Sequence, residues 1–273
     1  MAGALPCQPP ERTPVNSIFK PSAFCFAFGL ATLSLIAPAH AASDADKPTV
    51  VLVHGAFDDG SGWNNVVPAL LAKGLKVVSV QNPLSSLADD VAATRRVLDV
   101  QAGPVVLVGH SWGGMVITEI GVHPRVKSLV YVAAFAPSVG QSINDMAKDY
   151  PKPSGLDHVV VDKAGFVTLS FEGISKHFAQ DVPVAKQRLM TVVQGPIREA
   201  NFDEKVSVAA WSSKPSWFVV ADQDRMIQPA LQLDSAKKIS AKVVRVPASH
   251  VPQLSKSKQV TQAILEAAAA ARL

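Results

Sequence analysis

The stretch Val105–Thr118 reads VVLVGHSWGGMVIT and places a short apolar run before a glycine-rich turn and a second apolar run. The turn, Gly109-His110-Ser111-Trp112-Gly113, matches G-x-S-x-G, a weak pattern when it stands alone. Between a buried strand and a helix, the same pattern predicts a strained elbow that exposes the serine hydroxyl. A serine that only capped the following helix would not require glycines on both sides. Ser111 is therefore our candidate nucleophile.

Six runs rich in β-branched residues are predicted as strands. They are almost continuously apolar, as are strands that a parallel sheet buries on both faces. Helical periodicity fills the gaps at Trp63–Lys73 and Leu87–Val100. This alternation predicts an α/β fold with a doubly wound, mostly parallel sheet. The six runs are Thr49–His54, Lys76–Gln81, Val105–Gly109, Ser128–Ala133, Ser216–Ala221 and Lys242–Val246.

A long segment interrupts this alternation between the fourth and fifth runs, from Pro137 to Lys214. A crossover needs only about a dozen residues, so we predict an insertion at about residues 138–214. Within it, His158–Asp162 and Phe166–Ser170 are predicted to form a hairpin, and Val184–Val193 a helix. We expect this insertion to cap the carboxyl edge of the sheet, where open α/β folds bind ligands.

A serine nucleophile needs a general base, and four histidines follow Ser111 in the chain. His250 lies in the loop after the last predicted strand, from which a side chain can reach the elbow. His123 lies at a helix exit, and His158 and His177 lie in the insertion, where surface contacts are the expected role. We therefore predict His250 as the base.

The acid of a serine triad is expected after the fifth predicted strand, where ADQDRMI offers Asp222 and Asp224. Asp224 stands farther into the loop, whereas Asp222 closes the strand and is placed to bind turn amides. Asp145 and Asp149, after the fourth strand, are weaker candidates. We predict Asp224 as the acid.

The oxyanion of an acyl-transfer intermediate needs two N–H donors. One is expected from Trp112, the residue after the nucleophile, and the other from the loop after the first strand. We assign the second to Ala56, and we expect His54 to stabilise that loop.

The amino-terminal segment has the features of a secretory signal peptide. Arg12 and Lys20 precede the uncharged run SAFCFAFGLATLSLIA, and Ala39-His40-Ala41 has small residues where a signal peptidase requires them. We predict removal of residues 1–41, which leaves one domain over residues 42–273 and an exported protein, periplasmic or extracellular. Both cysteines lie in the removed segment, so no disulfide is expected.

The charged residues argue for a soluble surface. The full chain has a net charge of +4, and its basic residues are scattered, so we predict no nucleic-acid partner. No membrane association is expected once the signal peptide is removed. The sequence has no H-E-x-x-H and no Gly-Lys-Ser/Thr phosphate loop, so neither a metal nor a cofactor is predicted.

The motifs together resemble the α/β-hydrolase group that contains bacterial esterases, plant methyl-ester and salicylate esterases, and hydroxynitrile lyases. The resemblance is carried by VLVHGAFDDGSGW, QNPLSSLADDVAATRR, GHSWGG, LVYVAAFAP, WFVVADQDRMIQPALQ and ASHVPQL, which span most of residues 42–273 outside the insertion. It implies that Asp224 is the acid and that Ala56 and Trp112 are the oxyanion donors. Gly55 follows His54 where the lyases of the group have threonine, which disfavours a lyase. Serine at position 111 excludes the family members that need an aspartate nucleophile.

These inferences predict a serine hydrolase that cleaves small carboxylic esters through an acyl-serine intermediate, with Ser111, His250 and Asp224 as its triad. Two alternatives stay open at this stage. One is a cofactor-free haloperoxidase or perhydrolase that uses the same triad. The other is a ligand receptor that retains the triad. The sequence does not predict an oligomeric state.

Overall fold

A computed structural model describes residues 47–271. The predicted signal peptide, residues 1–41, lies outside the described residues. Within residues 47–271, no helix is both long and apolar enough to cross a membrane.

The core of the fold is a six-stranded sheet in which every neighbouring pair of strands is parallel. The strand order is β2-β1-β3-β4-β8-β9, so the chain winds outward from β1 in one direction and then from β3 in the other. The predicted α/β fold with a doubly wound parallel sheet is confirmed. The strands are β1 (Thr49–Val53), β2 (Lys76–Val80), β3 (Val105–His110), β4 (Val126–Val132), β8 (Ser216–Ala221) and β9 (Lys242–Val246).

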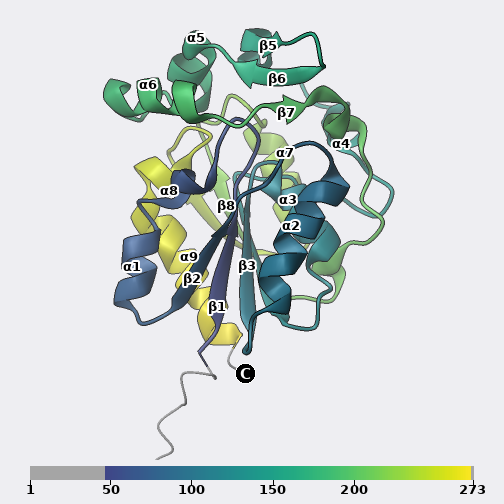
Figure 1. Ribbon diagram of the computed structural model, residues 1–273, viewed down its shortest axis with the longest axis vertical. Helices are drawn as coiled ribbons and strands as arrows, with labels where there is room; N and C mark the ends of the chain where they lie inside the picture. Colours follow the sequence, from purple (N-terminus) through teal and green to yellow (C-terminus); the bar gives the residue numbers. More distant parts are fainter. Residues whose placement is uncertain (1–46, 272–273) are drawn as a thin grey trace, which may run out of the picture. The chain divides into compact units, whose positions relative to one another are not determined.

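Helices cover both faces of this sheet (Figure 1). Val50, Leu52 and their counterparts on the other strands pack against α1 (Val67–Ala72) and α9 (Ser257–Ala270). The alternate residues, such as Val51 and Val53, pack on the other face against α2 (Leu87–Asp99), α3 (Gly113–Ile120) and α7 (Pro229–Lys238). Because successive strand side chains point to opposite faces, the central strands must be apolar at nearly every position.

Two expectations are corrected by the structure. The edge strands β2 and β9 are only partly buried, so they are not covered on both sides as the central strands are. The predicted helix Trp63–Lys73 is in fact a 3-10 turn, η1 (Gly60–Trp63), followed by the shorter helix α1, which begins at Val67. On α1, Leu70 is fully buried, whereas Leu71 is 53% exposed.

A cap lies between β4 and β8 in the sequence and covers the carboxyl ends of the central strands (Figure 1). Its three-stranded antiparallel sheet, in the order β5-β6-β7, contains the predicted hairpin and a third strand that was not predicted. The predicted helix Val184–Val193 is α6. The remaining elements of this segment are α4 (Ile143–Ala147), η2 (Ser154–His158), β5 (Val159–Val161), β6 (Phe166–Leu169), α5 (Phe171–Gly173), the π-helical turn η3 (Ile174–Phe178), β7 (Ile197–Arg198), η4 (Glu199–Asp203) and η5 (Ala210–Ser212); α8 (Pro252–Ser255) precedes α9.

Candidate active site

Ser111 sits in a strained turn between β3 and α3. Its φ is 52°, in the left-handed region that residues other than glycine seldom adopt. A Cβ on Gly109 would lie 2.6 Å from the carbonyl oxygen of Gly113, and one on Gly113 would lie 2.5 Å from that of Val53. The two glycines are therefore required for the close backbone approach that holds the elbow.

His250 and Asp224 are in direct contact. His250 lies in the loop between β9 and α8, and its Nδ1 donates to Asp224 Oδ2 at 2.7 Å. Both side chains are almost fully buried. Because Nδ1 carries the proton in this bond, Nε2 is the ring nitrogen left to face a partner in the pocket.

The Asp224 carboxylate is fixed by further donors. Its Oδ1 accepts from the backbone N–H groups of Met226, at 2.7 Å, and Ile227, at 3.0 Å. Its Oδ2 also accepts from Nε2 of Gln232 on α7, at 2.7 Å. Gln232 is fully buried, and its Oε1 accepts from the backbone N–H of Ala221 at the end of β8. Gln232 therefore ties the acid to its own strand.

The competing aspartates lie elsewhere. Asp222 forms an exposed ion pair in which Arg245 Nε and Nη2 donate to its Oδ1 at 3.0 and 2.9 Å. Asp145 belongs to the capping box that begins α4 and pairs with Lys205, and these contacts hold its pKa below the ordinary value. Asp149 lines a separate polar surface pocket. Among the described residues, Asp224 is the carboxylate that contacts His250.

The two predicted oxyanion donors lie at the same pocket as the elbow. Ala56 and Trp112 both line the pocket that contains Ser111 and His250. Within residues 47–271, neither backbone N–H is engaged in a backbone hydrogen bond. As expected, His54 braces the first loop: its Nε2 accepts from the backbone N–H of Asn82 at 2.9 Å.

Asp90 fixes the side chain of Trp112. Trp112 Nε1 donates to Asp90 Oδ2 at 2.6 Å, and the backbone N–H of Leu84 donates to the other oxygen at 2.8 Å. Asp90 is fully buried in α2, and this burial raises the pKa of its carboxyl to about 6. Asp90 therefore holds the residue that follows the nucleophile.

The cap contacts the loops that carry both His250 and Asp224. Gln180 Nε2 donates to the carbonyl oxygen of Gln223 at 2.7 Å, and the backbone N–H of Ser249 donates to Asp181 Oδ2 at 3.0 Å. The Phe178 ring packs edge-on against His250, with 5.0 Å between ring centroids. Residues 178–181 of the cap therefore support the loops that carry Asp224 and His250.

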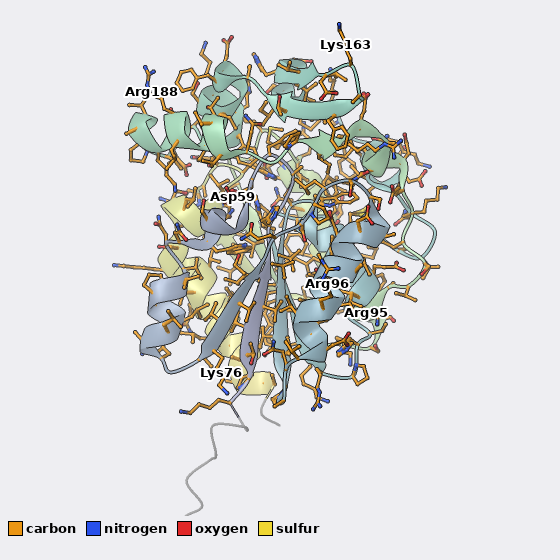
Figure 2. The ribbon with its side chains drawn as sticks, in the orientation of Figure 1. Asp59, Lys76, Arg95, Arg96, Lys163 and Arg188 are labelled. Carbon is orange, nitrogen blue, oxygen red and sulfur yellow. The ribbon has the colours of Figure 1, made fainter. Side chains whose placement is uncertain are left out.

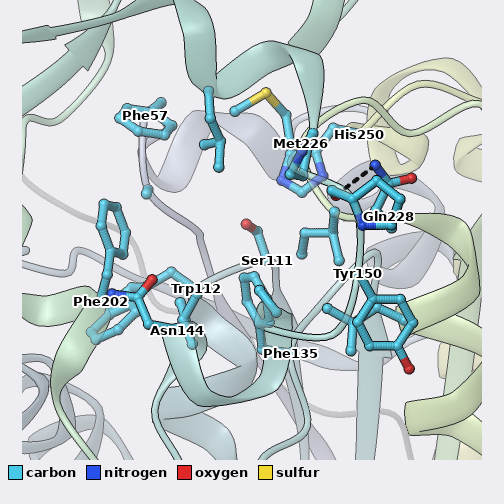
Figure 3. Close-up of a pocket in the computed structure, with 18 residues that line it drawn as sticks. Phe57, Ser111, Trp112, Phe135, Asn144, Tyr150, Phe202, Met226, Gln228 and His250 are labelled. Atoms are coloured by element: carbon cyan, nitrogen blue, oxygen red, sulfur yellow. Dashed lines mark hydrogen bonds between the residues drawn. The ribbon is translucent and has the colours of Figure 1, made fainter.

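The pocket at this site is lined mainly by apolar side chains (Figure 3). It encloses about 720 Å³ of empty space, part of it open to solvent, and Ser111 and His250 face into it. Tyr150 contributes its ring and turns its hydroxyl away to Asp234 Oδ2 at 2.7 Å. The aromatic residues of the lining are Phe57, Trp112, Phe135, Tyr150 and Phe202.

Fixed charges are absent from the lining of this pocket. None of the described lining residues is Asp, Glu, Lys or Arg. Charged side chains such as Lys163 and Arg188 instead extend outward from the cap (Figure 2). Across residues 47–271 no group of three His, Cys, Asp or Glu side chains is arranged to hold a metal ion.

Several residues of the site were not predicted from the sequence. Gln232 and Phe178 have no local pattern that connects them with Asp224 or His250. The sequence could have indicated Asp90, because the helical pattern places this carboxylate on the buried face of α2, between Leu87 and Thr94.

The family model described as the alpha/beta hydrolase family matches residues 50–263. The chain belongs to this family, as the sequence motifs predicted.

Two curated relatives match most of the chain. The pyrethroid hydrolase of Sphingobium wenxiniae is 26% identical over 245 residues, which cover 80% of this chain and 86% of that protein. Methylesterase 3 of Arabidopsis thaliana is 26% identical over 257 residues, which cover 81% and 96% of the two chains. Both names agree with the enzyme class predicted from the sequence, a hydrolase of the esterase kind.

The fold is shared with solved structures. The crystal structure of a pyrethroid hydrolase from Sphingobium faniae JZ-2 superposes with a TM-score of 0.70 at 23% identity, over 81% of this chain and 97% of that one. This likeness establishes the fold and does not by itself extend to substrate.

Proposed function

We propose that this protein hydrolyses carboxylic esters through an acyl-serine intermediate. Ser111 is the nucleophile, His250 the general base and then the general acid, and Asp224 the residue that orients the imidazole. The backbone N–H groups of Ala56 and Trp112 form the oxyanion hole.

In the acylation step, Ser111 Oγ attacks the ester carbonyl carbon while His250 Nε2 takes the hydroxyl proton. The carbonyl oxygen becomes an oxyanion, which accepts hydrogen bonds from the two N–H groups. The carbon–oxygen bond to the alcohol then breaks, and His250 returns the proton to the leaving oxygen. Water repeats the attack on the acyl-serine and releases the carboxylic acid.

The strongest support for this proposal is the arrangement of three residues. A serine in a strained elbow and an imidazole already bound to a buried carboxylate line the same pocket. Asp224 receives four hydrogen bonds, which fix the position of its carboxylate and thereby the imidazole tautomer that a base requires. The esterase and hydrolase names of the relatives support the same reaction class.

The lining favours an uncharged ester with an apolar or aromatic body. Burying an ionised group without a partner is costly, and the described lining offers no fixed countercharge. The five aromatic rings offer apolar surface instead. We therefore expect neutral aryl and alkyl esters to be turned over far faster than esters that carry a second, ionised carboxylate.

The test is pre-steady-state hydrolysis of neutral p-nitrophenyl esters, with mass spectrometry of the quenched enzyme. We expect a burst of about one nitrophenolate per enzyme and an acyl adduct on the peptide that contains Ser111. Ser111→Ala should lose both the adduct and labelling by a fluorophosphonate probe, with its melting temperature within a few degrees of the wild type. An adduct that persists in Ser111→Ala, or an absence of turnover on every neutral ester tried, would reject the proposal.

A further inference from the structure

A second carboxyl and imidazole lie together behind the elbow. Asp58, in the loop after β1, and His110, at the end of β3, are both buried, and Asp58 Oδ2 is 3.8 Å from His110 Nδ1. Among the residues that the structure describes, neither of these two atoms has a hydrogen-bond partner. Buried polar atoms are usually paired, so two that face each other call for an explanation.

Two glycines, Gly55 and Gly62, provide the space that the His110 and Asp58 side chains occupy. A Cβ on Gly62 would overlap the Asp58 carboxyl, and a Cβ on Gly55 would lie 3.2 Å from His110 Nδ1. Close packing on both sides fixes where the two side chains can sit.

The opposite side of the His110 ring determines its tautomer. His110 Nε2 lies 2.9 Å from the backbone carbonyl oxygen of His250. A carbonyl oxygen only accepts, so Nε2 carries the hydrogen, and in the neutral ring Nδ1 is an acceptor. Nδ1 therefore needs a donor, and the carboxyl of Asp58 lies 3.8 Å from it.

We propose that Asp58 and His110 form a second buried carboxyl–imidazole pair and act as positioning residues for His250. In this pair protonated Asp58 donates to His110 Nδ1, and His110 Nε2 donates to the carbonyl oxygen of His250. An approach of about 1 Å closes the first of these contacts into a hydrogen bond. The proposal rests on the proposed function, because that function makes His250 the base.

The electrostatics of the cluster agree with a neutral pair. Burial raises the pKa of Asp58 to about 7, and burial together with His250 holds the pKa of His110 well below its ordinary value. The charged and titratable groups that act on the pair are Asp59 and Lys186 on Asp58, and His54 and His250 on His110. Below neutral pH, the pair therefore holds one shared proton and no net charge.

The pair is packed directly against the proposed base. The rings of His110 and His250 are 4.9 Å apart between centroids, and Phe178 lies edge-on to both. When Asp58 ionises, its oxygen and His110 Nδ1 are both acceptors and the pair loses its hydrogen bond. The support of the His250 main chain then weakens as pH rises above about 7.

The test compares Asp58→Asn with Asp58→Leu. An asparagine amide donates N–H to His110 Nδ1 at every pH, whereas leucine has a similar size and no donor. We expect Asp58→Asn to keep kcat within about threefold and to lose the ionisation near pH 7 from the profile of kcat/KM. Asp58→Leu should lower kcat about tenfold with KM little changed. Asp59→Asn, which removes the neighbouring charge without contact with His110, is the matched control. It should keep the wild-type kcat and the ionisation, moved to a lower pH because the Asp59 charge contributes to the raised pKa of Asp58.

A second measurement does not depend on activity. A carboxyl whose pKa is raised on folding stabilises the fold at low pH, and this contribution is lost as pH rises through the folded-state pKa. The melting temperature of the wild type should therefore fall relative to Asp58→Asn between pH 5 and pH 8. If Asp58→Leu keeps the wild-type kcat and pH profile, or the difference in melting temperature does not change with pH, the pair does not act as proposed. If no ester is turned over by the wild type, the proposed function fails while the melting data still decide the state of Asp58.

Discussion

Gln232 and His250 donate to the same oxygen of Asp224, each at 2.7 Å. Gln232 belongs to α7, eight residues after Asp224, and its amide carries no charge and does not titrate. It therefore fixes the direction of the carboxylate without competing for the proton that the His250 imidazole holds. The carboxylate is thus held by Gln232 on α7 and by two backbone N–H groups of its own loop, in addition to the imidazole.

Replacing Gln232 by leucine should lower both stability and activity. The change removes a donor to Asp224 and leaves the backbone N–H of Ala221 buried without its acceptor, which costs about 1–3 kcal/mol of unfolding free energy. The imidazole then has more than one orientation available, so kcat should fall while KM changes little. Urea denaturation and steady-state kinetics measure the two effects. Wild-type values for both would show that Asp224 is held without Gln232.

The two aspartates after β8 should respond differently to the same substitution. Asp224→Asn removes the acceptor that fixes the His250 tautomer, so kcat should fall about 10⁴-fold in a protein that remains folded. Asp222→Asn weakens an exposed ion pair with Arg245, which costs at most about 1 kcal/mol. Activity per folded molecule should therefore be retained. Active-site titration alongside kcat measures this, and an inactive Asp222→Asn beside an active Asp224→Asn would reverse the assignment.

The buried carboxyl of Asp90 should make stability depend on pH. Its pKa is raised to about 6 by burial, so the stability it provides at low pH is lost as pH rises through about 6. Asp90→Asn loses one acceptor and should be less stable than the wild type at pH 5, and the gap should narrow by about 1 kcal/mol by pH 7.5.

The neighbouring Asp89 supplies the control for this experiment. It is exposed, and hydrogen bonds from Ser85 and Ser86 hold its pKa below the ordinary value. Asp89→Asn should keep the loss of stability between pH 5 and pH 7.5, moved to a slightly lower pH because the Asp89 charge contributes to the raised pKa of Asp90. Thermal melts of the wild type and the two variants at pH 5 and 7.5 test these expectations. If the difference in stability between Asp90→Asn and the wild type is the same at both pH values, Asp90 does not titrate in this range.

Export is predicted from the amino-terminal segment. Cleavage after Ala41 should give a protein that begins at or near Ala42 when it is recovered from the periplasm or the medium of a bacterial host. Edman sequencing of that fraction tests the prediction. Soluble cytoplasmic protein that retains Met1 would contradict it.

The sheet could be predicted from the sequence because its signals are local. A central strand buried on both faces must be apolar throughout, and the elbow needs glycines next to Ser111, so β3 and its turn are recognisable without any tertiary information. The edge strands could not be told from central ones, since what lies beside a strand is set by topology rather than by its own residues. The predicted helix Trp63–Lys73 began too early, because the 3-10 turn Gly60–Trp63 precedes α1.

The residues that support the candidate site depend on long-range contacts. Gln232 meets Asp224 only because α7 packs back beside β8, and Asp58 meets His110 only because β1 and β3 are neighbours in the sheet. Asp90 is intermediate: its place in the helical pattern predicts that it is buried, but not that it binds Trp112. The third cap strand, β7, has two residues and is too short to be detected from its composition.

Gln180 donates to the loop before Asp224, and Asp181 accepts from the loop before His250. These two hydrogen bonds affect how such a protein can be recombined with its relatives. A cap that touched the sheet only through apolar contacts could be exchanged between relatives as a cassette, and new substrate ranges would follow from simple grafting. Here the segment that covers the pocket also positions the loops that carry Asp224 and His250. A chimera that replaces residues 138–214 will keep its catalytic activity only if the new segment places an amide at position 180 and a carboxylate at position 181. Selection for a new substrate therefore acts on the pocket lining and on these two contacts at once.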